Sequence, residues 1–415
     1  MNRKSLTFFL FLVAVVRCLP LAASSADEPP FVEKYLLAGK LEEGEQALLA
    51  HLAKNEQDDQ ARFGLGVLQF CQAIDHLGQS LYRYGAGTED FFLNDMVPFL
   101  RMPVPENKDA EEVKSRDVRA ILQTIIDDLS AADETLERIG SEDVKLPLHL
   151  LAIRFDFDQD GSSGESESLK NIYLQYMGRR DRGVTDETIV VLDQADVYWL
   201  RGYCHLLQAM AESMLAYDFQ PLWDVAAHLA FPNVKNEMAY LKSKERRRRF
   251  DEGTILDTIA AIHSIQFKLA DAQRLKRAHS HLLEVTRLSR KSWDAIMAET
   301  DDDQEWIPNP RQKSAVTRAA ITDEMVKTWR DFLDELDALL KGEKLAPFWR
   351  GSDAEIGINL WKIFAEPTDF DLVYWIQGSG MKPFLEKGEL TSPETWSRFQ
   401  RVFRGNFIGF AIWFN

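Results

Sequence analysis

Residues 193–217 read DQADVYWLRGYCHLLQAMAESMLAY, and their pattern indicates the fold class more firmly than any other part of the chain. Apolar side chains recur here every three or four residues, which is the spacing of one face of an α-helix. They form two stripes, namely Val197, Leu200, Cys204, Leu207, Ala211 and Met214, and Trp199, Tyr203, Leu206 and Met210. A helix that is apolar over so much of its surface is buried. We therefore expect a central helix over residues 193–217.

The polar side chains of this helix form one narrow strip, made of Arg201, His205, Gln208 and Glu212. The strip either faces solvent and satisfied polar groups, which is the commoner arrangement, or lines a pocket. In the next segment, Asp224 and His228 are four residues apart on one helical face, as two ligands of a metal would be. With no third ligand nearby, we expect an ordinary contact between them.

The other segments also repeat with a helical period, and none alternates over several strands, so we predict an all-α chain. It forms either a multi-helical bundle or an irregular helical-repeat array. The clearest neighbouring helix spans 109–139 and carries one apolar stripe. Residues 254–299 contain no Gly or Pro, which predicts one long helix or a hairpin with an unmarked turn. A further helix follows Thr322 and ends at Gly342.

Between these helices lies an acidic loop, residues 156–167, whose spacing suits a calcium ion. Calcium takes six to eight oxygen ligands, and a twelve-residue loop supplies them when carboxylates recur at alternate positions before a sharp turn. Positions 1, 3, 5, 6 and 12 of such a loop are here Asp156, Asp158, Asp160, Gly161 and Glu167. The backbone carbonyl of Ser162 adds a further ligand. The loop thus predicts a Ca²⁺ site formed by Asp156, Asp158, Asp160, Ser162 and Glu167.

Over about 25 residues this segment resembles the EF-hand family, because it matches the EF-hand loop expression in full. Leu150, Leu151 and Phe155 precede the loop at the spacing of a short entering helix. Ser163 stands where paired EF-hands usually have a branched apolar residue, and no second loop of this spacing occurs. The resemblance therefore implies one unpaired site, either structural or a weak sensor rather than a tight buffer. The alternative is a solvated acidic turn, since Asp, Gly and Ser favour turns in any case.

The N-terminal part resembles tetratricopeptide repeats over about 50 residues. Residues 39–48 are similar to the second helix of one repeat and residues 61–66 to the first helix of the next, with Gly44 at the small packing position. Glu56 stands where proline is expected, so the pattern is degenerate. We expect helical hairpins over residues 31–84, either true repeats or ordinary α-hairpins.

Residues 1–26 have the features of a secretory signal peptide. Arg3 and Lys4 precede an apolar run from Leu6 to Val16, and small residues end at Ala26. The apolar run is too short to span a bilayer, and no later stretch is long enough. We therefore expect an exported protein, periplasmic or secreted, without a transmembrane segment in its mature chain.

Charge and cysteine content limit the partners and the covalent structure. The signal segment holds three of the 49 basic residues and none of the 66 acidic ones, so the mature chain is strongly acidic. An acidic chain disfavours nucleic acid and anionic membranes as partners, and leaves an unknown protein partner. Cys71 and Cys204 form one disulfide or remain buried thiols.

We divide the mature chain into three regions. Residues 27–140 contain the N-terminal helical hairpins, 141–300 the acidic loop and a central helical domain, and 301–415 an aromatic-rich helical region. We expect the apolar loop at 84–108 to cover the core, the basic block at 242–249 to be solvated, and the apolar end at 407–415 to be buried.

Two functions are compatible with these features. The first is an exported calcium-binding α-helical protein, a structural or interaction scaffold that calcium stabilises, and it follows from the acidic loop and the absence of any known catalytic motif. The alternative is a cell-envelope hydrolase whose site is assembled from distant residues, such as Arg201, His205, Asp224 and His228.

Overall fold

The computed structural model describes residues 31–86, 102–177, 185–235, 252–316, 320–351, 355–403 and 410–411. It is mostly helical, as predicted, and its helix α8 (Gln194–Leu215) corresponds to the central helix expected at 193–217. The predicted signal segment and the basic block at 242–249 lie outside the described residues. Within the described part, no helix is long and apolar enough to cross a membrane.

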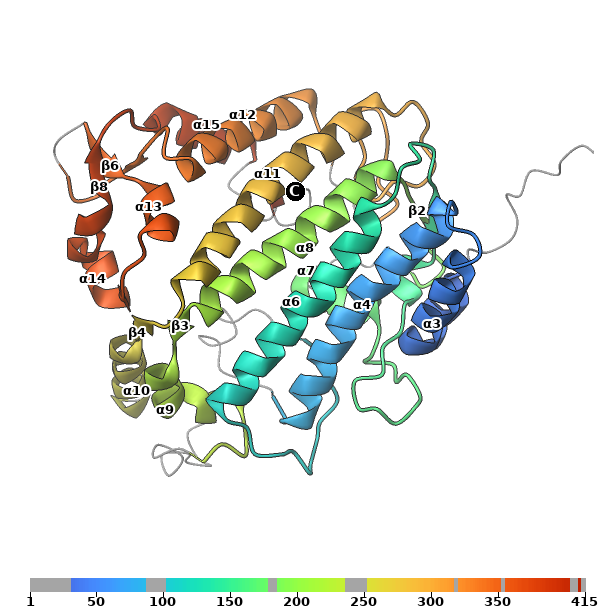
Figure 1. Ribbon diagram of the computed structural model, residues 1–415, viewed down its shortest axis with the longest axis horizontal. Coiled ribbons are helices and arrows are strands. Elements are labelled where there is room, and N and C mark those ends of the chain that lie inside the picture. Colours follow the sequence, from blue (N-terminus) through green and yellow to red (C-terminus); the bar gives the residue numbers. More distant parts are fainter. Residues whose placement is uncertain are drawn as a thin grey trace, which may run out of the picture.

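The long helices lie side by side in one row, which Figure 1 shows running diagonally across the molecule. Helix α8 lies between α6 and α11, and each of these has a further neighbour. In order, the row is α3 (Leu41–Leu52), α4 (Asp59–Arg83), α6 (Ser115–Glu137), α8, α11 (Ala272–Ala298) and α12 (Asp323–Leu340). Asp193 begins α8 by accepting a hydrogen bond from the Ala195 amide at 2.7 Å.

Shorter helices connect and flank this row. They are α2 (Glu33–Ala38), the 3₁₀ helix η2 (Leu150–Ala152), α7 (Leu169–Met177), α9 (Gln220–Ala230), α10 (Glu252–Ser264), α13 (Leu360–Ala365), α14 (Leu372–Gln377), the 3₁₀ helix η5 (Ser379–Phe384) and α15 (Pro393–Val402).

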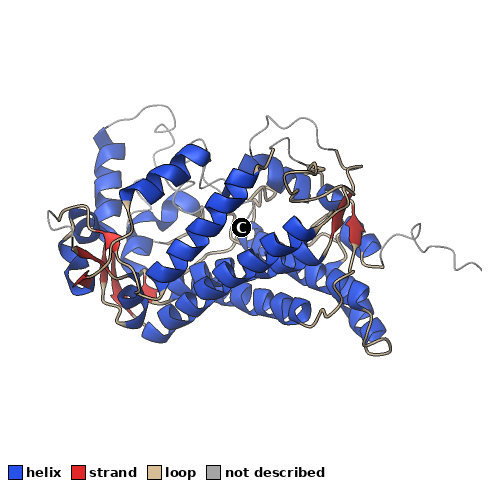
Figure 2. Cartoon of the chain, turned by 90° about the horizontal axis from the view of Figure 1, so that it is seen from above, coloured by secondary structure: helices blue, strands red, loops and turns tan. Residues whose placement is uncertain are grey.

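Three small antiparallel sheets, which the all-α prediction did not include, lie toward the two ends of the molecule (Figures 1 and 2). In one, β1 (Leu146–Leu148) pairs with β2 (Val190–Leu192), with Leu146 opposite Leu192. The other two have the orders β3 (Tyr217–Asp218), β4 (Gln266–Leu269), β7 (Phe370–Asp371), and β5 (Ala346–Pro347), β6 (Ile356–Ile358), β8 (Leu385–Lys387). Strands of two to four residues are too short to show an alternating pattern in the sequence.

One predicted helix boundary was wrong, and the stretch 254–299 is not one long helix. Helix α6 begins at Ser115 rather than near residue 109, and the Lys114 amide donates to Asp117 Oδ2 at its start. The stretch 254–299 is divided by strand β4, and Asp271 then caps α11 by accepting from the Gln273 amide at 2.9 Å. Aspartate is a common N-cap residue, so Asp271 marks the start of α11 although no Gly or Pro separates the two helices.

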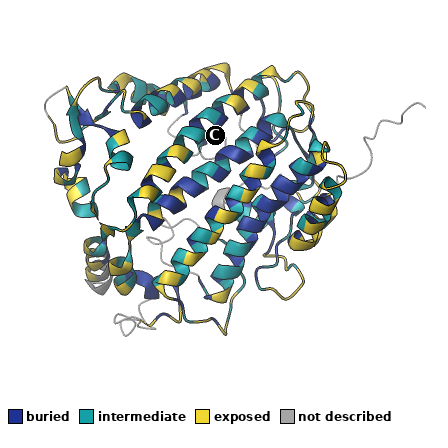
Figure 3. Ribbon diagram, viewed as in Figure 1, coloured by how far each residue is buried: buried dark blue, intermediate teal, exposed yellow. Residues whose placement is uncertain are grey.

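The largest core cluster draws on all three predicted regions, from Val32 to Phe410. In Figure 3 the buried positions concentrate on α4 and α8. Phe410 is buried, with its ring stacked on Trp293 and edge-on to Trp329, so this part of the apolar C-terminal segment packs into the core as expected. Cys71 and Cys204 are both buried free thiols, which resolves the alternatives for this pair.

The N-terminal hairpin is formed by α3 and α4. A Cβ atom at Gly44 would lie 2.6 Å from Leu68 Cδ1 and 2.7 Å from Tyr35 Cβ, so this position admits no side chain. Helix α4 has 25 residues and continues far beyond the hairpin contact, until it lies against the acidic loop.

Candidate metal centre

The acidic loop is closed at its base by backbone hydrogen bonds of an antiparallel kind. The Phe155 amide donates to Glu167 O at 2.9 Å, and the Leu169 amide donates to Ile153 O at 3.0 Å. Helix α7 leaves the loop at Leu169, whereas the chain enters through the single 3₁₀ turn η2, which ends at Ala152. The entering helix that the EF-hand resemblance implied through Phe155 is therefore absent, since residues 153–155 are extended.

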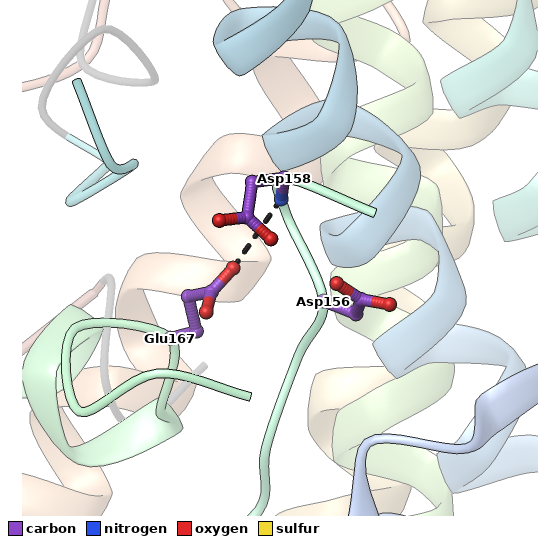
Figure 4. Close-up of side chains that lie close together, drawn as sticks. All are labelled: Asp156, Asp158 and Glu167. Carbon is purple, nitrogen blue, oxygen red and sulfur yellow. Dashed lines mark hydrogen bonds between the residues drawn. The ribbon is translucent and has the colours of Figure 1, made fainter. Parts of the chain in front are cut away.

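Three of the five predicted ligand residues converge in the loop. Asp156, Asp158 and Glu167 each offer an oxygen, and these atoms lie within 4.8 Å of one another. In Figure 4, Asp158 and Glu167 face each other while Asp156 lies on the side of α4. Gly161 has a φ of +82°, as the sharp turn requires, and its amide donates to Asp156 Oδ2 at 3.1 Å.

Glu167 holds the loop together from its last position. It is 2% exposed, and its Oε1 accepts from the amides of Phe157 at 2.7 Å and Asp158 at 3.3 Å. Its Oε2 accepts from the Gly164 amide at 2.6 Å. A carboxylate has about four acceptor positions. Bidentate binding of a cation by Glu167 would therefore release at least one of these amides.

Asp156 supplies the observation that tests whether a cation fits. Its Oδ1 is inaccessible and has no hydrogen-bond partner, although a buried carboxylate oxygen normally has one. Burial raises the pKa of Asp156 above its usual value, and the neighbouring charge of Asp158 raises it further. A hard cation beside this oxygen would satisfy it and cancel both effects. The converging carboxylates could therefore hold a divalent cation.

The predicted ligand Asp160 lies differently. The carboxylate of Asp160 is exposed, and its Oδ1 accepts from the amide of Ser162 at 2.8 Å and from its hydroxyl at 2.7 Å. These hydrogen bonds lower the pKa of Asp160. Asp160 does not belong to the converging group of carboxylates among the described residues. Asp160 would have to turn away from Ser162 to reach a cation.

Helix α4 supports the loop from behind, through residues that the sequence analysis missed. Asp75 Oδ1 accepts from the Asp156 amide at 3.0 Å, and its Oδ2 accepts from Gln79 Nε2 at 2.9 Å. Gln79 Nε2 also lies 3.2 Å from Asp156 O. Burial raises the pKa of Asp75 to about 7, with smaller contributions from the charges of Asp156 and Glu167. Helix α4 thus brings a fourth carboxyl group close to the three that converge.

The contact between α4 and the loop requires a glycine. Phe157 is fully buried and stacks on Phe155 with 5.3 Å between ring centroids. A Cβ atom at Gly78 would lie 2.1 Å from Phe157 Cδ1. A glycine in the middle of a long helix lowers the stability of that helix. Its presence at position 78 was therefore the feature of the sequence that could have indicated this close approach.

A second acidic cluster lies where α8 begins and α11 ends. Oxygens of Asp193, Glu299 and Glu305 lie within 4.8 Å of one another, and Gln312 Nε2 donates to Glu299 Oε2 at 3.0 Å and to Glu305 Oε1 at 3.1 Å. Burial raises the pKa of Glu299 to about 8 and that of Glu305 to about 7. It also raises the pKa of Asp196 well above its usual value. These carboxyl groups therefore share protons near neutral pH.

The four residues of the alternative hydrolase site lie on two helices. Arg201 Nε donates to Asp133 Oδ1 at 2.7 Å, and His205 Nε2 lies 3.4 Å from Asp133 Oδ2. Asp224 accepts from Gln220 Nε2 at 2.6 Å on its own helix. Helix α9, which carries Asp224 and His228, packs on α10 and β4. The contacts of Asp133 thus join Arg201 to His205 but include neither residue of α9.

Comparisons with known proteins give no independent assignment. No protein-family model matches the chain, and no curated protein or solved structure is significantly similar to it.

Proposed function

We propose that this is an exported calcium-binding α-helical protein, a structural or interaction scaffold in which Ca²⁺ stabilises the fold. The observation that carries the proposal is the convergence of Asp156, Asp158 and Glu167 in a loop that is docked on α4. The EF-hand spacing adds Asp160 and the Ser162 carbonyl as further oxygen ligands. Water completes the shell at the loop's exposed side.

A stabilising role follows from the surroundings of the loop. Four carboxyl groups, those of Asp75, Asp156, Asp158 and Glu167, are held near one another against their mutual repulsion. A divalent cation would offset that repulsion and fix the loop between α4 and α7. The tetratricopeptide-like hairpin of α3 and α4 lies next to this junction and supports a scaffold that binds another protein.

The first test is thermal unfolding of the purified mature chain in excess EGTA and in millimolar Ca²⁺. A ligand that binds only the folded state adds about 2.7 kcal/mol at 100 times its Kd, which corresponds to a rise in Tm of about 3 °C for a chain of this length. We expect Glu167→Gln to abolish this rise. The matched control is Glu165→Gln, which removes the same charge from an exposed position of the same loop and should retain the rise.

Two results would overturn the proposal. One is a Tm that calcium does not change, and the other is a calcium-dependent rise that survives in Glu167→Gln. If both variants lose the calcium-dependent rise in Tm, the effect of calcium depends on the net charge of the loop and not on Glu167 as a ligand.

A further inference from the structure

The row of long helices contains a pair of histidines that the calcium proposal does not involve. His205 of α8 and His281 of α11 face each other with 2.8 Å between their Nδ1 atoms. Their ring centroids are 5.1 Å apart. His205 is largely buried and His281 is half-buried, so the pair lies in the helix interface with one side open to water.

Asp133 of α6 orients the first ring. His205 Nε2 lies 3.4 Å from Asp133 Oδ2, and Arg201 Nε holds Oδ1 of the same carboxylate at 2.7 Å. A proton on His205 Nε2 is therefore stabilised by Asp133, which leaves the Nδ1 lone pair directed at His281. A carboxylate that holds one nitrogen of a histidine while the other nitrogen binds a metal is a recurrent arrangement in metal sites.

The charges around the pair nearly balance. Four carboxylates pair with four guanidinium groups here, namely Asp133 and Glu137 with Arg201, Glu212 with Arg274 and Arg277, and Glu284 with Arg287. Two protonated imidazoles at this separation would repel each other, so the position between the Nδ1 atoms holds one proton or one metal ion. An imidazole nitrogen binds Zn²⁺ at about 2.0–2.1 Å, which puts two such nitrogens about 3.3 Å apart in a tetrahedral site. A small rotation of either ring would provide this separation.

We propose that His205 and His281 form a binding site for a divalent transition-metal ion, with both Nδ1 atoms as ligands and Asp133 as the residue that positions His205. Zn²⁺ and Cu²⁺ suit imidazole ligands, whereas Ca²⁺ requires oxygens. Water at the open side of His281 completes the coordination. The ion would link α8 to α11 near the middle of the row, and through Asp133 would fix both to α6.

The experiment is a calorimetric titration of the full mature chain with ZnCl₂ in saturating Ca²⁺, so that the acidic loop does not contribute. We expect one equivalent of Zn²⁺ to bind, and binding to be lost in His205→Gln and in His281→Gln. Asp133→Asn should weaken binding by about 10- to 100-fold, as expected for a group behind a ligand. The control is His76→Gln, which removes a histidine that pairs with Asp128 on α6 at 2.8 Å and that contacts no other imidazole among the described residues.

A spectroscopic measurement on the unaltered chain complements the variants. With one equivalent of Cu²⁺, the electron paramagnetic resonance spectrum should show coupling to two imidazole nitrogens. Absence of Zn²⁺ binding, equal binding by His281→Gln, equal loss in His76→Gln, or a Cu²⁺ spectrum with fewer than two nitrogens would each overturn the proposal. If the transition-metal proposal fails, the calcium proposal is unaffected, because the two sites share no residue.

Discussion

Gly78 allows the close approach of α4 to the acidic loop, because a side chain there would meet Phe157. Ala in place of a helical Gly ordinarily stabilises by up to about 1 kcal/mol. At Gly78, however, the new methyl group would meet the buried ring of Phe157, and overpacking costs about 1–3 kcal/mol. We expect Gly78→Ala to lower the free energy of unfolding by about 1–2 kcal/mol in urea denaturation. Gly202→Ala in α8 is the matched control, since its Cβ would lie 3.9 Å from Leu288 Cβ, and it should be neutral or stabilising. Equal stability of the two variants would contradict the close approach.

At the scale of elements, carboxyl groups at the start of α8 and the end of α11 stay protonated to a higher pH than usual. Glu299 caps the C-terminus of α11, where the helix dipole disfavours a negative charge, and burial raises its pKa to about 8. The unfolded chain releases this proton near pH 4.5, so the folded state binds more protons between about pH 4.5 and 8 and stability falls as pH rises through that range. The slope is at most about 1.4 kcal/mol per pH unit for each proton. Glu299→Gln mimics the protonated group and should flatten the decline in denaturation curves recorded from pH 5 to 8. The exposed Glu142→Gln should leave the slope unchanged; an equally steep slope in Glu299→Gln would refute this account.

For the whole molecule, Phe410 joins the C-terminal segment to the middle of the row. Its ring lies 6.2 Å from Trp293 of α11 and 5.3 Å from Trp329 of α12, centroid to centroid. Truncation of a buried Phe to Ala typically costs about 3–5 kcal/mol. We expect Phe410→Ala to destabilise the entire chain by that amount in chemical denaturation. Phe31→Ala, at a position that is 42% exposed, should cost about 1 kcal/mol or less. A similar effect of both changes would mean that Phe410 does not anchor the core.

The sequence predicted the helical class and α8 because a 3.6-residue period persists through a long segment. It predicted the residues of the acidic loop because their spacing is local. It missed Asp75, Gly78 and Gln79, which are about 80 residues away from the loop and acquire their role only when α4 packs against it. It also missed the pairing of His205 with His281, since neither helix shows which face will meet the other. A contact between segments that are far apart in the chain leaves no repeating pattern in the sequence.

The position of Phe410 has a consequence for the order of events during synthesis. Val32 and Phe410 belong to one core cluster but are separated by most of the chain. At 5–20 residues per second, a ribosome needs about 20 to 75 seconds to proceed from the first to the second. For that interval the apolar faces of the early helices lack part of their cover. Until Phe410 emerges, this exposed apolar surface favours aggregation of the nascent chain.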